Sequence, residues 1–322
     1  MGWLYNAFGW VLNFIYGFVS NYGVSIILLT LFIKIILLPL TLKQQKSMTK
    51  MQRIQPKLKE IQEKYKDDKD KSAQETMKLY KEYGVSPMGG CLPMLIQFPI
   101  LIAFYNVIRE PVEYVLGIAG KELTALFKEF GIPAKEAGAQ IQLAEEMYSA
   151  SAGRDGINFD FLGLDLAEVP WDELKLIYSD GKINWIVLTV LIIPILACVT
   201  TYLTSKVSTA MNKTKKEEKK EETKPQRILS PEQKKSAPNT GESMTKSMTY
   251  MMPLMTLFFT FTLPAAMGLY WTVSNVLSMV QTILLNSYYN KKMAVEIEDQ
   301  DKIREAKIQE KIKKYNMKKK RG

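Results

Sequence analysis

One charged side chain, Lys34, lies inside the apolar stretch TLFIKIILLPL, which runs from Thr30 to Leu40. An ammonium group at the centre of a membrane-spanning helix costs about 2.5–3.5 kcal/mol on insertion scales. On a helix, Lys34 would lie about 12 Å from the end of the apolar segment at Leu42, because each residue adds about 1.5 Å. That is further than a lysine side chain reaches comfortably. We therefore predict that Lys34 lies in a water-filled recess, where its charge can attract acidic or polar groups.

Uncharged polar side chains in the other apolar runs would add to such a recess. They are Gln97, Asn106, Thr272, Ser274, Asn275, Ser278 and Gln281. Side chains of this kind are costly where they face lipid. The alternative is a structural role, in which they form hydrogen bonds between helices. For Lys34 a functional role is favoured, because a structural lysine needs a carboxylate partner and none of the long apolar runs contains one.

Covalent and metal chemistry find little support in the sequence. The chain has 0 histidines, which excludes a histidine base and histidine metal ligands. Cys91 and Cys198 have no disulfide or metal-site spacing, and we expect them to be buried packing residues. A membrane hydrolase with a Ser–Lys pair is an alternative, but Ser25 lies about 13 Å from Lys34 along the helix and has no nucleophile motif around it. We predict a protein that is not an enzyme and needs no cofactor or metal.

Long uncharged runs predict an all-α, polytopic membrane protein. Lys34 is the only charged residue among the first 42, and uncharged runs of 26, 23 and 44 residues begin at Tyr83, Ile183 and Ser247. About 20 residues cross the hydrocarbon core, so the 44-residue run must hold two spans. In its middle, LPAAMG supplies the Pro and Gly for a tight turn. The five predicted spans are residues 22–42, 85–110, 184–205, 247–264 and 267–289.

The segments between the spans differ in composition. Residues 1–21 are rich in Trp, Tyr and Phe and predict an interfacial helix. Residues 43–84 have apolar side chains at helical spacing on both sides of the charged turn KDDKDKS, which predicts a helical hairpin. Residues 111–183 predict a loop with short helices and an apolar patch, FDFLGL, resting against the membrane surface. Residues 206–246 read as a disordered linker and residues 290–322 as a basic tail with a helical stretch.

The distribution of basic residues predicts the orientation. The segments Lys43–Glu82, Lys206–Lys246 and the tail from Lys291 contain 12, 11 and 12 basic residues. The loop Pro111–Lys182 contains 6 basic and 13 acidic residues. Because cytoplasmic loops are enriched in Lys and Arg, the first three segments are expected in the cytoplasm and the acidic loop outside. The predicted topology is N-out and C-in.

Three stretches carry a family resemblance. PMGGCLPMLIQFPILIAFY, from Pro87, resembles the second-span signature of the YidC-type membrane protein insertases. MMPLMTLFFTFTLPAAMGLYWTVSNVLSMVQT, from Met251, resembles their last two spans. The first span and its sequel, SIILLTLFIKIILLPLTLKQQKSMTKMQRIQPKLKEIQ, are similar to the family's opening segment. The three lie in the family's order and cover most of residues 22–110 and 245–290.

The resemblance implies five core spans around a hydrophilic groove, open to the cytoplasm and to lipid and closed to the outside. Lys34 stands where the family usually has an arginine, which keeps the positive charge but loses the bidentate geometry of a guanidinium. Thr30 and Trp271 occupy positions that line the substrate path in relatives. Together with the polar residues above, the expected groove is formed by Lys34, Thr30, Gln97, Trp271, Asn275 and Gln281.

The function implied is the transfer of nascent transmembrane segments and short polar tails into the bilayer of the bacterial cell membrane, alone or with the Sec translocon. Nascent membrane proteins are the expected partners, with the signal recognition particle receptor as a further candidate. The basic tail, ending KIKKYNMKKKRG, suits a ribosome or anionic lipids, and equally a signal that retains it in the cytoplasm. A small-solute channel or transporter is the alternative, although we find neither a charged path to the far side nor an internal repeat.

Overall fold

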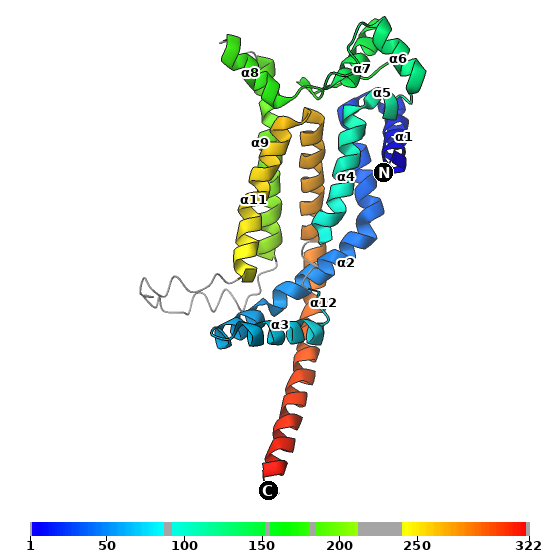
Figure 1. Ribbon diagram of the computed structural model, residues 1–322. Helices are drawn as coiled ribbons and strands as arrows, with labels where there is room; N and C mark the ends of the chain where they lie inside the picture. Colours follow the sequence, from blue (N-terminus) through cyan, green and yellow to red (C-terminus); the bar gives the residue numbers. More distant parts are fainter. Residues whose placement is uncertain (1, 87–91, 152–154, 181–184, 212–239, 320–322) are drawn as a thin grey trace. The chain divides into compact units, whose positions relative to one another are not determined.

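The computed structural model describes residues 2–86, 92–151, 155–180, 185–211 and 240–319. The chain divides into two compact units, each described separately below (Figure 1). Unit 1 comprises residues 1–38, 94–206 and 246–280, and unit 2 comprises residues 39–93, 207–245 and 281–322. Cys91 and most of the predicted linker lie outside the described residues.

Almost every described element is helical. The helices are α1 (Gly2–Val19), α2 (Tyr22–Lys64), α3 (Lys69–Tyr83), α4 (Leu92–Arg109), α5 (Pro111–Tyr114), α6 (Gly120–Glu129), α7 (Ala139–Ala150), α8 (Pro170–Asp180), α9 (Trp185–Met211), α11 (Thr240–Thr262) and α12 (Ala265–Lys319). Two short strands, β1 (Asp160–Phe161) and β2 (Leu164–Asp165), pair antiparallel between α7 and α8. Helices α2 and α12 each contribute to both units.

Among the described residues, three helices are long and apolar enough to cross a membrane. They are α2, residues 191–210 of α9 and residues 265–285 of α12. Two shorter apolar segments, Leu95–Arg109 of α4 and Tyr250–Thr262 of α11, fall below that length. The prediction of a helical membrane protein is thus confirmed, while the number of five spans stays a prediction.

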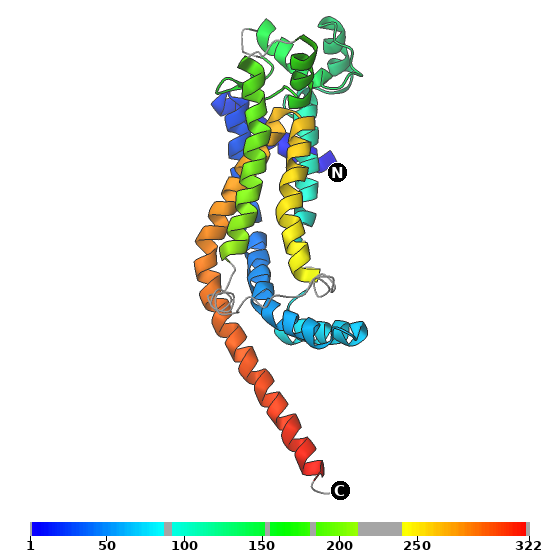
Figure 2. The ribbon, with the colours of Figure 1, turned by 90° about the vertical axis from the view of Figure 1, so that its left-hand side faces the viewer.

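The core of unit 1 forms where α1, α4 and α12 meet. Phe104 of α4 is fully buried and lies between two aromatic rings. Tyr270 of α12 stacks on it at 4.1 Å between ring centroids, and Phe8 of α1 meets it edge-on at 5.7 Å. Such pairs stabilise a core by roughly 0.5–1.5 kcal/mol beyond their buried area. In Figures 1 and 2, α9 and α11 run beside α12, and their Thr201 and Thr256 hydroxyls are 3.4 Å apart.

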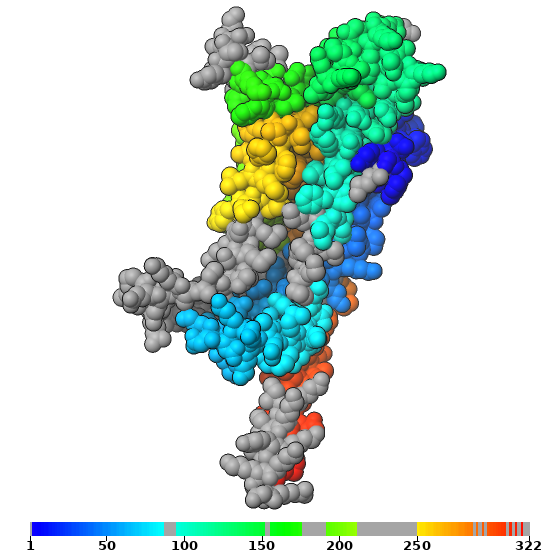
Figure 3. Space-filling model, in the orientation of Figure 1, coloured from blue at the N-terminus to red at the C-terminus, as the bar shows by residue number. Residues whose placement is uncertain are grey.

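The outer faces of these helices are apolar. Large exposed side chains include Phe32, Ile35 and Ile36 on α2, Leu95, Phe98 and Ile102 on α4, and Met251, Leu254 and Phe258 on α11. In Figure 3, α11 (yellow) and α4 (cyan) are both seen at the surface of the molecule. Exposed apolar patches of this extent are rare on proteins surrounded by water and are expected on helices surrounded by lipid.

The predicted turn between the last two spans needs a correction at its glycine. The chain turns at Leu263 and Pro264, between the end of α11 and the start of α12, as the proline predicts. Gly268, however, lies inside α12. A Cβ atom there would come within 2.4 Å of the Cγ2 of Ile193 on α9. The glycine is therefore needed for close helix packing rather than for a left-handed turn conformation.

The loop between α4 and α9 folds against the ends of the spans in unit 1. Its buried apolar residues, such as Leu143, Ile157 and Leu166, join the core of that unit. The carbonyl oxygens of Glu168 and Leu166 accept hydrogen bonds from the N–H groups of Ala265 and Ala266, at 2.8 and 3.0 Å. The loop thus provides hydrogen-bond acceptors for two N–H groups at the N-terminus of α12. The first N–H groups of a helix have no partner within the helix itself. The FDFLGL patch forms the β1–β2 hairpin, which the helical prediction for this loop missed.

Unit 2 contains the second half of α2, α3 and the extension of α12. Ile54 and Leu58 of α2 pack with Leu79 and Tyr83 of α3 and with Ile297 of α12. Asp68 caps the N-terminus of α3, because its carboxylate accepts a hydrogen bond from the N–H of Lys71 at 2.9 Å. Pro56 lies inside α2, and α12 is helical through the predicted tail to Lys319. The position of this helix pair in the cytoplasm stays a prediction.

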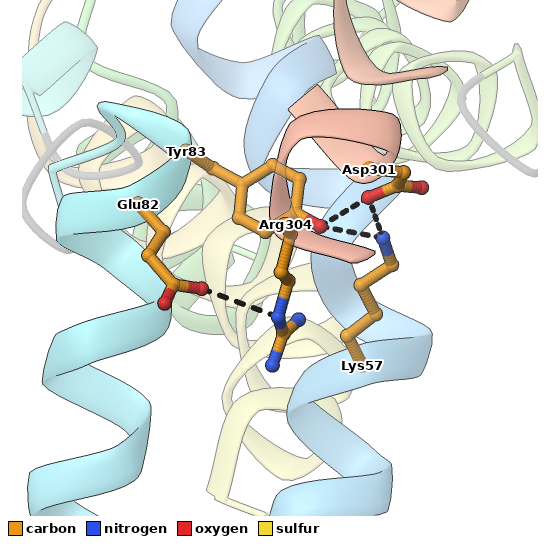
Figure 4. A network of polar contacts seen from close by, with 5 residues as sticks. All are labelled: Lys57, Glu82, Tyr83, Asp301 and Arg304. Atoms are coloured by element: carbon orange, nitrogen blue, oxygen red, sulfur yellow. Dashed lines mark hydrogen bonds and ion pairs between the residues drawn. The ribbon is translucent and has the colours of Figure 1, made fainter. Parts of the chain in front are cut away.

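A polar network joins the same three helices of unit 2. The carboxylate of Asp301 on α12 accepts hydrogen bonds from the ammonium group of Lys57 on α2 and from the hydroxyl of Tyr83 on α3 (Figure 4). Lys57 also donates to the Tyr83 hydroxyl at 2.6 Å, and Arg304 pairs with Glu82 at 3.3 Å. Burial raises the pKa of Asp301, but the hydrogen bonds from Lys57 and Tyr83 outweigh it, so the pKa is lower than usual.

Candidate functional site: polar groups on the apolar helices

Lys34 is placed by the amphipathic pattern of α2. Ile26, Leu29 and Thr30 form the buried face of this helix, whereas Phe32 and Ile35 are exposed. Lys34 follows Thr30 by four residues, which puts both on nearly the same face. A lysine on this face is directed toward the neighbouring helix of unit 1 rather than outward.

The partner of Lys34 is a neutral hydroxyl. Its Nζ donates to the Oγ of Ser278 on α12 at 2.7 Å, and Ser278 in turn donates to the carbonyl of Ser274 at 2.7 Å. In the described part of the chain, no carboxylate forms an ion pair with Lys34. An ammonium group held only by a hydroxyl keeps its charge available for a third group, such as an acidic segment of another protein.

Thr30 and Trp271, which the family resemblance predicts in the groove, both make local contacts. Thr30 is buried, and its hydroxyl donates to the carbonyl of Ile26 at 2.6 Å, within its own helix. Trp271 of α12 is half-buried and stacks on Phe259 of α11, with 6.5 Å between ring centroids. Their proposed contact with a substrate stays a prediction.

Gln97 of α4 meets a residue that sequence reasoning missed. Its Nε2 donates to the hydroxyl of Tyr270 at 2.5 Å. Tyr270 is the aromatic residue that also stacks on Phe104. The sequence pointed to Tyr270 only through its position directly before Trp271 in the LYW motif. Its hydrogen bond with Gln97 depends on the packing of α4 against α12, which the sequence does not show.

Asn275 connects α12 to α9. Its Nδ2 donates to Thr201 Oγ1 at 2.7 Å and lies 3.5 Å from Thr200 Oγ1. The backbone carbonyl of Asn275 accepts a hydrogen bond from the hydroxyl of Thr204 at 3.2 Å. The spacing of these three threonines on one helical face was the signal in the sequence. These contacts suit a residue that holds two helices together, and a substrate-facing role for Asn275 stays a prediction.

The remaining predicted polar residues have other hydrogen-bond partners. Gln281, which belongs to unit 2, donates from its Nε2 to Thr41 Oγ1 at 2.7 Å. Thr272 donates to the carbonyl of Gly268, and Asn106 to that of Ile102, each within its own helix. No group of three or more acidic, cysteine or histidine ligands among the described residues could hold a metal ion. The described contacts of Lys34 and Ser278 are hydrogen bonds, and the charge of Lys34 can also attract anionic groups.

Acidic groups in the loop of unit 1 have perturbed pKa values. Burial, followed by repulsion from Asp165, Glu168 and Glu146, raises the pKa of Glu145 to about 7. Burial, followed by repulsion from Glu173, raises the pKa of Glu168 to about 7 as well. This loop is consequently less acidic at neutral pH than its composition indicates.

Comparison with known proteins identifies the family. The model of the 60Kd inner membrane protein family matches residues 14–292. The chain belongs to this family. A membrane protein insertase, YidC 2 of Listeria innocua, is 31% identical over 309 residues, which covers 95% of this chain and 78% of the relative. The resemblance seen in the motifs is thereby confirmed, and the chain is a multi-pass protein of the bacterial inner membrane.

Shorter matches reach higher identity. YidC of Haemophilus influenzae is 46% identical over 104 residues, covering 32% of this chain and 19% of the relative. YidC of Fusobacterium nucleatum is 42% identical over 114 residues, covering 34% of this chain and 56% of the relative. Both relatives, like that of Listeria, are named membrane protein insertases.

Proposed function

We propose that this protein is a membrane protein insertase that uses Lys34 to attract polar, acidic segments of its clients. Its insertase function follows from its family and from the names of its relatives. The observation that carries the role of Lys34 is its hydrogen bond to Ser278, a partner that leaves the positive charge uncompensated.

The physical problem is the transfer of a polar tail across the hydrocarbon core. Each unsatisfied polar group in that core costs several kcal/mol. A hydrated recess shortens the apolar distance that the tail must cross, and the cation at Lys34 lowers the energy of an acidic tail within it. The apolar segment of the client then moves along the exposed faces of α2 and α11 into lipid, driven by burial of its apolar surface.

The groove, the five spans and the orientation belong to the same proposal. We place the apolar segments of α4 and α11 across the membrane with α2, α9 and α12, because α4 connects the basic segment Lys43–Glu82 to the acidic loop and α11 follows the basic segment Lys206–Lys246. In a variant without cysteines, single cysteines at Lys43 and Lys318 should be protected from an impermeant thiol reagent in intact cells, and one at Lys121 should react. Labelling of all three would contradict the N-out, C-in orientation.

The proposed partners follow from charge. Nascent membrane proteins are the clients, delivered by a ribosome to which the basic residues near the end of α12 are attracted. Anionic lipids suit the same residues. The Sec translocon and the signal recognition particle receptor are further proposed partners, since either would deliver clients at the membrane. A channel for small solutes is not favoured, and a tracer-flux assay in liposomes should give no flux above that of empty vesicles.

The test of Lys34 uses purified protein in liposomes and a single-span client with an acidic N-terminal tail, whose insertion is read by protease protection. Two unit charges about 7 Å apart attract by about 2 kcal/mol at an effective dielectric constant of about 20. That corresponds to roughly thirtyfold in rate. Lys34→Arg should therefore retain insertion, Lys34→Ala should slow it by up to this factor, and Lys34→Glu should be slowest.

Two controls separate attraction from other roles. A client with lysines in place of its tail acids should insert better with Lys34→Glu than with Lys34→Ala. Ser278→Ala should leave insertion close to normal, whereas a Ser–Lys hydrolase would lose its nucleophile and all activity. If Lys34→Ala inserts the acidic client as fast as the unmodified protein, the electrostatic role is wrong.

A further inference from the structure

The β1–β2 hairpin presents an apolar residue in an unfavourable conformation. Asp160 pairs with Asp165 and Phe161 with Leu164, so Leu162 and Gly163 form a two-residue turn. Both have positive φ, +56° and +76°. Turns of this kind favour Asn-Gly or Gly-Gly, because a side chain such as that of leucine is strained in the left-handed region.

Among the described residues, little packing compensates for the strain at Leu162. The Leu162 side chain is 85% exposed, so it gains almost no packing within the chain. Its neighbours along the hairpin behave differently, since Phe159 is buried and Phe161 is half-buried. A single exposed leucine is ordinary on a protein surface, but a leucine that is both strained and exposed indicates a partner outside the chain.

The turn is fixed beside the point where α2 begins. A Cβ atom on Gly23 would come within 2.3 Å of the ring of Phe161, so the ring packs directly on the helix backbone. The side chain of Asn21 donates to the carbonyl of Asp160 at 3.1 Å, and the N–H of Tyr22 is 3.4 Å from the carbonyl of Asn158. The apolar segment of α2 starts at these residues. The turn therefore lies level with the first residues of this apolar segment.

Helix α1 supplies a second apolar surface next to the same segment. The hydroxyl of Tyr16 on its inner face accepts from the N–H of Asn158 at 2.8 Å. On its outer face, Trp10, Phe14 and Phe18 are exposed, with Trp10 stacked on Phe14 at 5.9 Å. Exposed aromatic side chains are typical of the boundary between lipid and water. The exposed face of α1 therefore suits the same boundary between lipid and water.

The two acidic groups at the base of the hairpin each accept a hydrogen bond from the backbone. The carboxylate of Asp160 accepts from the N–H of Gly163 at 3.0 Å, and that of Asp165 accepts from the N–H of Ala167 at 2.9 Å. Both carboxylates are thus partly satisfied by the backbone, and Leu162 lies between them in sequence at the tip of the hairpin.

We propose that the β1–β2 hairpin is a membrane anchor whose Leu162 side chain enters the lipid at the leaflet where α2 begins. Partition of the leucine into lipid offsets its backbone strain. Because the same loop satisfies the N-terminus of α12 through Leu166 and Glu168, the anchor holds that contact at a fixed depth. This inference rests on α2 being a membrane span and not on the insertase mechanism.

The first test measures the depth of residue 162. The protein, with Cys91 and Cys198 replaced and a single bimane-labelled cysteine at Leu162, is reconstituted in vesicles of phosphatidylcholine and phosphatidylglycerol. Lipids with a nitroxide on the acyl chain should quench this probe several-fold more than a probe at Lys121, an exposed loop position, and aqueous iodide should show the reverse order. Equal quenching of the two sites by iodide, with none by the lipid, would overturn the proposal.

The second test separates lipid contact from folding. Asparagine tolerates positive φ, so Leu162→Asn should leave the hairpin as protected from hydrogen exchange in detergent as the unmodified chain, or more so. In vesicles, the unmodified hairpin should exchange several-fold more slowly than in detergent, and the asparagine variant should lose this extra protection. Faster exchange of the variant in detergent would instead assign Leu162 a packing role within the protein and refute the anchor.

Discussion

Replacing Asp301 by asparagine should loosen the extension of α12 from α2 and α3 while leaving each helix formed. In unit 2, Asp301 is the one carboxylate that accepts from both Lys57 and Tyr83 in the described network. Asparagine has nearly the same shape, so Ile297 can stay in the apolar cluster below it. The substitution therefore removes the charge and little of the packing.

The expected loss is about 1–2 kcal/mol. Hydrogen bonds to charged groups contribute about 1.5–3 kcal/mol, and this range is reduced because the side chains of Lys57 and Asp301 are 27% and 35% exposed. The neighbouring pair of Arg304 and Glu82 is 36% and 50% exposed and should contribute about 0–1 kcal/mol. Because the pKa of Asp301 is lowered, its contribution is complete above about pH 4 and disappears as the pH falls through the folded-state value.

Hydrogen exchange of the purified protein in detergent measures this loss. At neutral pH, amides between Glu296 and Arg304 should exchange about 5–30 times faster in Asp301→Asn, the factor that corresponds to 1–2 kcal/mol. Arg304→Ala should have a smaller effect. Lys302→Ala, which removes an exposed pair with Glu298, should have none. Unchanged exchange in Asp301→Asn, or an equal effect of Arg304→Ala, would refute the reasoning.

Two further predictions concern unit 1. Gly268→Ala should lower the free energy of unfolding by about 1–3 kcal/mol through overpacking against Ile193, and Ile193→Ala should restore part of it in a double variant, as thermal unfolding in detergent would measure. The pKa values of Glu145 and Glu168 are raised, so their contribution to stability is greatest below about pH 4.5 and is lost as the pH rises through about 7. Acidification from pH 8 to pH 5 should therefore raise the melting temperature. In Glu168→Gln, the change in the free energy of unfolding over this pH range should be smaller by roughly 1 kcal/mol. A pH profile identical to that of the unmodified chain would contradict this prediction.

The sequence predicted what depends on local composition. Uncharged runs located the apolar helices, and Pro264 marked the turn before α12, because proline lacks a donor and favours breaks. The motifs also led to the family. Contacts between residues that are far apart in sequence could not be predicted from local composition. Ser278 became the partner of Lys34, and Ile193 the reason for Gly268, only through the packing of helices that are far apart in sequence, since the first pair is separated by 244 residues and the second by 268 − 193 = 75. The β1–β2 hairpin was missed because strands of two residues leave too short an alternation to recognise.

The two hydrogen bonds at the start of α12 set an order of assembly. The ribosome completes the loop that contains Leu166 and Glu168 about 100 residues before it makes Ala265 and Ala266, so the acceptors exist when the last helix arrives. In lipid, a helix end without such acceptors leaves N–H groups unsatisfied and would be driven back toward water. The loop therefore provides hydrogen-bond acceptors for the N-terminus of α12 before that helix is made. We expect substitutions that unfold the loop to reduce the retention of α12 in the membrane, although the altered residues are far from α12 in sequence.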